Sequence, residues 1–190
     1  MLVGDDMSAH SLFSSLPNLI SLGRLILVPV IVALIAEPEW AAAFALFLVA
    51  GVSDAVDGWL AKRFDLRSEL GSYLDPIADK ALLVSIYVSL AVTGVLPAAI
   101  AILVVSRDLM IVGAVLFCWV VDKPMEIRPL VLSKLNTAAQ IALATAVLWA
   151  KAFGMPLQPW LPVALYLVAA LTLASMVAYL VQWLRHMEIW

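Results

Sequence analysis

Long runs of apolar residues follow one another along almost the whole chain, separated by short polar or proline-containing stretches. Each run is close to the ~20 residues that an α-helix needs to cross the hydrocarbon core of a bilayer. Prolines, glycines and charged residues mark the breaks between the runs. The pattern predicts six membrane-spanning helices, near residues 18–36, 40–60, 72–94, 98–121, 130–151 and 161–184.

The composition supports an all-α integral membrane protein. Hydrophobic residues make up 65% of the 190 positions, more than the surface of a soluble domain of this length could conceal. Six spans use nearly the whole chain, so we expect one membrane domain over residues 1–190, a six-helix bundle with no separate soluble domain. Residues 1–16 are expected to form an N-terminal segment, in which residues 8–16 are either a short surface element or a disordered tail. This start lacks the pattern of a secretory signal, so the first span is expected to be retained.

Most basic residues beside the predicted spans fall on one side of the bundle, whereas the opposite side holds Glu37, Glu39 and Lys151. The basic residues on the first side are Lys62, Arg63, Arg67, Lys123, Arg128, Lys134 and Arg185. The positive-inside rule therefore predicts that both termini face the cytoplasm, and we expect a bacterial inner membrane. The formal net charge of -3 gives no sign of a nucleic-acid partner, and the single cysteine, Cys118, excludes an intramolecular disulfide.

Four aspartates lie close together in the sequence around the end of the second run and the start of the third: Asp54, Asp57, Asp75 and Asp79. Residues three or four apart share one face of a helix, so each helix presents a carboxylate pair and the two pairs can face each other. Like charges at this spacing repel unless cations lie between them. Oxygen ligands without His or Cys favour Mg²⁺ or Mn²⁺, and two such ions can clamp a diphosphate.

Small residues accompany these aspartates. Gly58, Gly71 and Ala61 leave room either for a bulky ligand or for close packing of helices, and the sequence leaves both interpretations open. Asp75 precedes Pro76, which also suits a helix N-cap with proline in the first turn. That interpretation does not explain Asp79 or the earlier pair.

The spacing D-x2-D-G-x2-A-K-x8-G-x3-D-x3-D, from Asp54 to Asp79, resembles the signature of the CDP-alcohol phosphatidyltransferases. It departs at Lys62, where the family has arginine, although Arg63 follows directly. Arginine offers phosphate a bidentate fork and lysine only a point charge. Because six spans with the motif at the second and third also resemble this family, the resemblance covers nearly the whole chain.

The resemblance implies a mechanism. Asp54, Asp57 and Asp75 would bind two divalent ions that hold the diphosphate of CDP-diacylglycerol. Asp79 would touch metal and take the proton from an acceptor hydroxyl, which then displaces CMP. The other residues expected at the CDP-lipid are Asn18, Ser21, Gly58, Ala61, Lys62, Arg63 and Gly71.

Other charges within the runs are candidates for binding the acceptor alcohol. Arg107 and Asp108 either serve function or pair with each other, and Lys134 either binds the acceptor or anchors its helix at the interface. The segments 106–108 and 133–137 look most like the CDP-alcohol-type cardiolipin synthases, whose acceptor is phosphatidylglycerol. Phosphatidylglycerophosphate synthases, which use glycerol 3-phosphate, are the alternative. The family resemblance also implies a homodimer.

Two other classes fit less well. A cation channel or transporter could use a ring of acidic residues, but these aspartates lie at helix ends and no broken helix mirrors them in the second half of the chain. Membrane prenyltransferases also bind diphosphates through aspartates, yet they would have two acidic motifs far apart in sequence.

Overall fold

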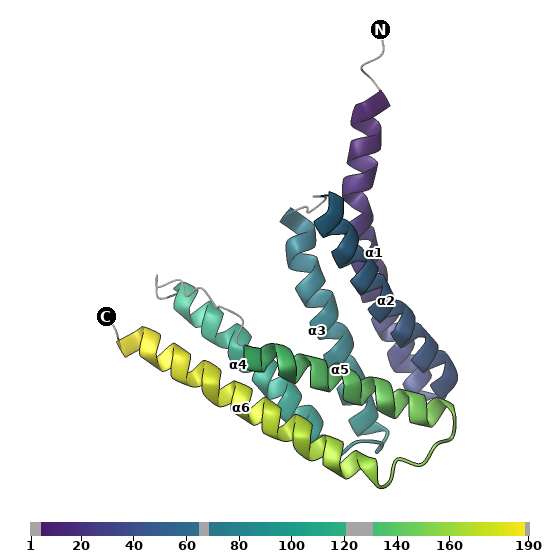
Figure 1. Ribbon diagram of the computed structural model, residues 1–190, viewed down its shortest axis with the longest axis vertical. Coiled ribbons are helices and arrows are strands. Elements are labelled where there is room, and N and C mark those ends of the chain that lie inside the picture. The colour runs from purple at the N-terminus through teal and green to yellow at the C-terminus, as the bar shows by residue number, and fades with distance from the viewer. Residues whose placement is uncertain (1–4, 65–68, 121–130, 189–190) are drawn as a thin grey trace.

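The computed structural model describes residues 5–64, 69–120 and 131–188, and all of its regular structure in these ranges is helical. Six helices follow in order (Figure 1). They are α1 (Asp5–Ala36), α2 (Trp40–Phe64), α3 (Glu69–Val92), α4 (Ala98–Val120), α5 (Val131–Ala152) and α6 (Trp160–Glu188). The six predicted runs each correspond to one helix, and the all-α fold class is confirmed.

The first helix is longer than the apolar run that predicted it. It begins at Asp5 and continues through Pro17 without a break. Residues 8–16 form the first turns of α1, so the disordered tail is wrong, and a surface position for these turns stays a prediction. Figure 1 shows this part of α1 extending away from the other helices.

Two helices end where the sequence supplies a glycine. Gly94 has a φ of 72° and Gly154 a φ of 64°, a left-handed backbone conformation that glycine adopts without a Cβ clash. The Val95 amide then donates to the Leu90 carbonyl at 2.9 Å, and the Met155 amide to the Ala150 carbonyl at 2.7 Å. These bonds satisfy carbonyls at the ends of α3 and α5 that would otherwise lack a partner.

The helices form two groups of three. Helix α1 packs against both α2 and α3, while α6 packs against α4 and α5. Contacts of α5 with α2 and of α3 with α4 and α5 join the groups. The shared core contains Ile35, Phe47, Ile86, Leu90 and Leu148. The C-terminal part of α2 and the start of α3, which carry the acidic motif, lie at the same end of the bundle (Figure 1).

The outer surface is apolar, as lipid contact requires. Large hydrophobic side chains stay exposed along the helices, including Val92 at 82%, Tyr166 at 79% and Val163 at 71%. Among the described residues, Ala98–Cys118, Val131–Ala152 and Trp160–Arg185 are long and apolar enough to cross a membrane. Ile20–Ala36 and Trp40–Val56 are shorter apolar helical segments. The chain is an integral membrane protein, and the count of six spans stays a prediction.

Candidate functional site

The acidic motif is organised around a buried arginine from α1. The Arg24 side chain is 1% exposed, and its Nη1 donates to Oδ1 of Asp54, on α2, at 2.6 Å and to Oδ1 of Asp79, on α3. One nitrogen therefore joins carboxylates from two helices. The sequence showed only that the carboxylates of Asp54 and Asp79 could face each other. In the structure, both carboxylates bind the guanidinium of Arg24.

The two carboxylates also face outward. The side chain of Asp54 is 44% exposed and that of Asp79 is 50% exposed, although Arg24 itself is buried. One positive and two negative charges leave this cluster with a net charge of about −1. The exposed side of the pair therefore offers carboxylate oxygens as ligands for a cation.

The remaining motif positions lie on the same two helices. Asp57 follows Asp54 by three residues on α2, and Asp75 precedes Asp79 by four on α3, so each pair shares a helix face. Their side chains lie outside the described part of the structure. The same holds for the side chains of Asn18, Ala61 and Lys62 and for the surroundings of Gly71.

Of the positions expected at the CDP-lipid, three are described. Gly58 is exposed, and a Cβ added there would meet nothing within 4 Å, so the described helices do not require glycine for close packing at this point. Arg63 is exposed near the end of α2. Ser21 is buried one helical turn before Arg24, on the side of α1 that faces the motif.

The donor atoms of the site fit a hard divalent cation. Asp54 and Asp79 provide oxygen only, which Mg²⁺ and Mn²⁺ prefer. Within the described residues there is no group of three or more His, Cys, Asp or Glu side chains that could hold a metal. Asp57 and Asp75, whose side chains lie outside the described part of the structure, stay predicted ligands.

A second polar cluster lies in the other half of the bundle. Arg107 on α4 is 4% exposed, and its Nη1 donates to Oδ1 of Asp108 at 2.6 Å. Its Nη2 donates to Oγ of Ser133 on α5 and, at 3.2 Å, to Oγ of Ser175 on α6. The Tyr179 ring lies 5.7 Å from the guanidinium carbon, within cation–π range. Arg107 and Asp108 do pair, and Arg107 also links three helices.

Lys134 does not join this cluster in the described contacts. Its neighbour Ser133 contacts Arg107, whereas Lys134 is exposed on α5. A different lysine reaches the cluster, because Lys80 Nζ lies 3.0 Å from Oδ1 of Asp108. Lys80 follows Asp79 directly, so an ion pair connects the acidic motif to the Arg107 cluster.

Farther along α5 and α6, buried polar groups continue the cluster into the bundle. Thr172 donates to Oδ1 of Asn136 at 2.8 Å and accepts from Nε2 of Gln140 at 3.3 Å. The Tyr87 hydroxyl donates to the backbone carbonyl of Gln140 at 3.0 Å. Asn136, Gln140 and Thr172 are all 0–1% exposed. Asn136 belongs to the segment 133–137 that the sequence analysis singled out, but its partner Thr172 on α6 had no signal in the sequence.

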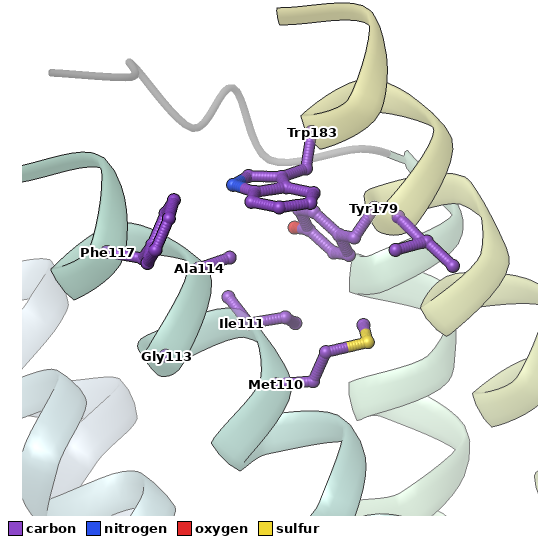
Figure 2. A pocket seen from close by; sticks show the side chains of 8 residues that line it. Met110, Ile111, Gly113, Ala114, Phe117, Tyr179 and Trp183 are labelled. Atoms are coloured by element: carbon purple, nitrogen blue, oxygen red, sulfur yellow. The ribbon is translucent and has the colours of Figure 1, made fainter. Parts of the chain in front are cut away.

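An apolar cavity of about 270 Å³ lies between α4 and α6 (Figure 2). Tyr179 belongs both to its wall and to the Arg107 cluster. The Phe117 and Trp183 rings meet edge to face, with centroids 5.8 Å apart. The lining residues are Met110, Ile111, Gly113, Ala114, Phe117, Tyr179, Leu180 and Trp183. A cavity of this size and chemistry suits a hydrocarbon chain segment better than a polar ligand.

Sequence comparison places this arrangement among known proteins. The sequence model of the CDP-alcohol phosphatidyltransferases matches residues 14–184. The chain is 35% identical over 185 residues to the chloroplastic CDP-diacylglycerol–glycerol-3-phosphate 3-phosphatidyltransferase 1 of Oryza sativa, covering 88% of this chain and 56% of that protein. It is 33% identical over 181 residues to the human CMP-forming cardiolipin synthase, covering 87% of this chain and 60% of that protein.

A bacterial relative is also similar. The CDP-diacylglycerol–glycerol-3-phosphate 3-phosphatidyltransferase of Bacillus subtilis is 30% identical over 149 residues, which cover 70% of this chain and 76% of that protein. The chain thus spans little more than half the length of the rice and human relatives. Relatives of both acceptor types therefore resemble it at similar identity.

Proposed function

The chain belongs to the CDP-alcohol phosphatidyltransferase family, and on that premise we propose that it is a cardiolipin synthase. It would transfer the phosphatidyl group of CDP-diacylglycerol to phosphatidylglycerol, giving cardiolipin and CMP. The observation that carries this choice is the apolar cavity that shares Tyr179 with the Arg107 cluster. A lipid acceptor brings both a phosphate charge and hydrocarbon chains, which suit a cation beside an apolar cavity.

The donor would bind at the acidic motif. Asp54, Asp57 and Asp75 are the proposed metal ligands, with Asp79 beside them. When bound, two Mg²⁺ or Mn²⁺ ions would neutralise the diphosphate and the charge that develops on CMP. The open position at Gly58 leaves room next to these ligands for the nucleotide.

The remaining residues expected at the donor have less specific roles. Ala61 and Gly71 would leave space for cytidine, and Lys62 or Arg63 would meet a phosphate. Asn18 and Ser21 would contact the CDP-lipid from α1, which packs against both motif helices.

The reaction step needs a base next to the diphosphate. Asp79 would accept the proton of the acceptor hydroxyl, whose oxygen forms a bond to the β-phosphorus. The bridging bond between the β-phosphorus and its oxygen to the α-phosphate then breaks, and CMP leaves with the electron pair. The Arg24 guanidinium contacts Asp79 and would hold its carboxylate in place for this step.

The acceptor would approach from the α4–α6 half of the bundle. Its phosphodiester charge would be held by Arg107 and by the exposed Lys134, and one acyl chain would enter the cavity between α4 and α6. Lys80 and Asp108 connect this region to Asp79, so the acceptor and the base lie on linked helices.

Phosphatidylglycerophosphate synthesis is the second candidate, because the rice and Bacillus subtilis relatives carry that activity in their names. The acceptor would then be glycerol 3-phosphate, which has no apolar part to fill the cavity. We also propose a homodimer in a bacterial inner membrane, with the acidic motif at the cytoplasmic face; the positive-inside distribution of Lys and Arg supports this orientation.

Product analysis by mass spectrometry tests the proposal. Purified full-length protein receives CDP-diacylglycerol and Mn²⁺ or Mg²⁺, with phosphatidylglycerol and glycerol 3-phosphate offered in parallel reactions. Cardiolipin together with CMP is the expected result. Phosphatidylglycerophosphate would assign the second function with the same donor site, and folded protein that uses neither acceptor would overturn both acceptor assignments.

A further inference from the structure

Arg24 is the most deeply buried charged group in the described α1–α3 half of the bundle. It lies in the apolar run of α1 with 2% of its surface exposed, and intramembrane charges are retained chiefly where function requires them. Its Nη1 makes both ion pairs, but its Nε and Nη2 are buried and have no hydrogen-bond partner among the described residues. For packing alone, an apolar side chain at this position would be more stable than arginine, because it would leave no buried donor without a hydrogen bond.

We propose that Arg24 is a positioning residue for the transferase centre: it fixes the α2 carboxylate of Asp54 relative to the α3 carboxylate of Asp79. Both contacts use the Oδ1 atoms, and both aspartates are about half exposed on the side away from Arg24. Hydrogen bonds to carboxylate ligands set the orientation in which their other oxygens meet a metal. The inference rests on the proposed roles of Asp54 as ligand and Asp79 as base.

The topology explains why a residue from a third helix is needed. Asp54 and Asp79 lie on different helices, and their like charges repel each other. Helix α1 packs against both α2 and α3, so a cation on α1 can bridge the two. Loss of Arg24 would remove the contact through which one guanidinium holds both carboxylates.

The test compares Arg24→Met and Arg24→Lys with the unchanged protein, using full-length protein purified in detergent. Arg24→Met removes the charge and keeps an unbranched side chain. Arg24→Lys keeps the charge on a side chain one atom shorter, so the ammonium falls short of the point between the carboxylates. Arg185→Met, at an exposed position of α6, is the control for losing an arginine. The readouts are Mn²⁺ affinity by titration with electron paramagnetic resonance, the midpoint of thermal unfolding, and kcat and KM.

For Arg24→Met we expect Mn²⁺ affinity and kcat to fall, each by about 10- to 100-fold, as for other residues that orient metal ligands. Arg24→Lys should recover the unfolding midpoint while Mn²⁺ affinity and kcat stay reduced. Arg185→Met should leave Mn²⁺ affinity and kcat unchanged.

Three results would overturn the inference. Unchanged or tighter Mn²⁺ binding by folded Arg24→Met would show that the arginine does not orient the ligands. Full recovery of affinity and kcat by Arg24→Lys would show that charge alone is sufficient. Absence of Mn²⁺ binding by the unchanged protein would overturn the proposed metal site itself, and the inference with it, which distinguishes that failure from the first two.

Discussion

Replacing Asp79 by Asn separates the role of this residue as base from its role in holding the site together. The substitution nearly preserves shape, and the amide oxygen can still accept the hydrogen bond that Arg24 Nη1 donates to Oδ1. It removes the negative charge and the group that takes a proton. Arg24 also retains Asp54, at 2.6 Å, as an ionic partner, so the buried guanidinium is not left without a counter-charge.

The size of the effect follows from these contacts. Loss of general base catalysis typically lowers a rate by about 10²- to 10⁴-fold. At about 1.36 kcal/mol for each factor of ten, this corresponds to about 2.7–5.4 kcal/mol of transition-state stabilisation. Donor binding should change far less, because Asp54 and the position of Asp57 on α2 are unchanged by this substitution.

Two assays are required. Release of CMP from CDP-diacylglycerol, with saturating phosphatidylglycerol and Mn²⁺, measures kcat. Equilibrium binding of CDP-diacylglycerol in the presence of Mn²⁺, without acceptor, measures the donor site. Glu39→Gln, at an exposed acidic position between α1 and α2, controls for loss of one carboxylate and should leave both measurements unchanged. Loss of donor binding by Asp79→Asn would refute the assignment and make Asp79 chiefly a metal ligand.

Three further substitutions test other parts of the site. Asp57→Asn should weaken Mn²⁺-dependent binding of CDP-lipid as well as activity, and normal binding would mean that the metal site is misplaced. Ala114→Leu fills the apolar cavity and should raise the KM for phosphatidylglycerol several-fold but leave the KM for glycerol 3-phosphate unchanged. Val112→Phe, on the exposed side of α4, is the control and should change neither KM. An equal rise in the KM for phosphatidylglycerol in both variants would argue against an acyl chain in the cavity. Thr172→Val removes a buried hydroxyl that joins two amides and should lower the free energy of unfolding by about 0.6–1.7 kcal/mol, the range for hydrogen bonds between membrane helices. Thr145→Val, whose hydroxyl bonds only within α5, should cost less in the same denaturant titration.

The sequence was sufficient to predict the helices and part of the site because these depend on local pattern. The apolar runs match six helices, and Gly94 ends α3 through a backbone conformation that its neighbours could not adopt without strain. The i, i+3 and i, i+4 spacings place each aspartate pair on one helix face. These are properties of single segments, and they require no knowledge of neighbouring helices.

Contacts between helices were harder to predict for a physical reason. A membrane helix is apolar toward its neighbours and toward lipid alike, so periodicity does not reveal which side is buried. Arg24 is a charged residue in an apolar run, but nothing in the sequence pairs it with Asp54 and Asp79. The contact of Arg107 with Ser175, 68 positions away, is of the same kind. The long α1 was missed because its first turns carry polar residues that hydropathy does not distinguish from a loop.

Adjacent residues of α3 are tied to opposite halves of the bundle: Asp79 to Arg24 on α1, and Lys80 to Asp108 on α4. Under the proposed function, the reaction centre lies in α1–α3 and the cavity for the acceptor lies in α4–α6. Under that proposal, substitutions in α4–α6 would change the choice of alcohol while leaving the residues of the reaction centre as they are. The Lys80–Asp108 pair limits this freedom, because a drift of α4 large enough to break it would also disturb the position of the neighbouring base.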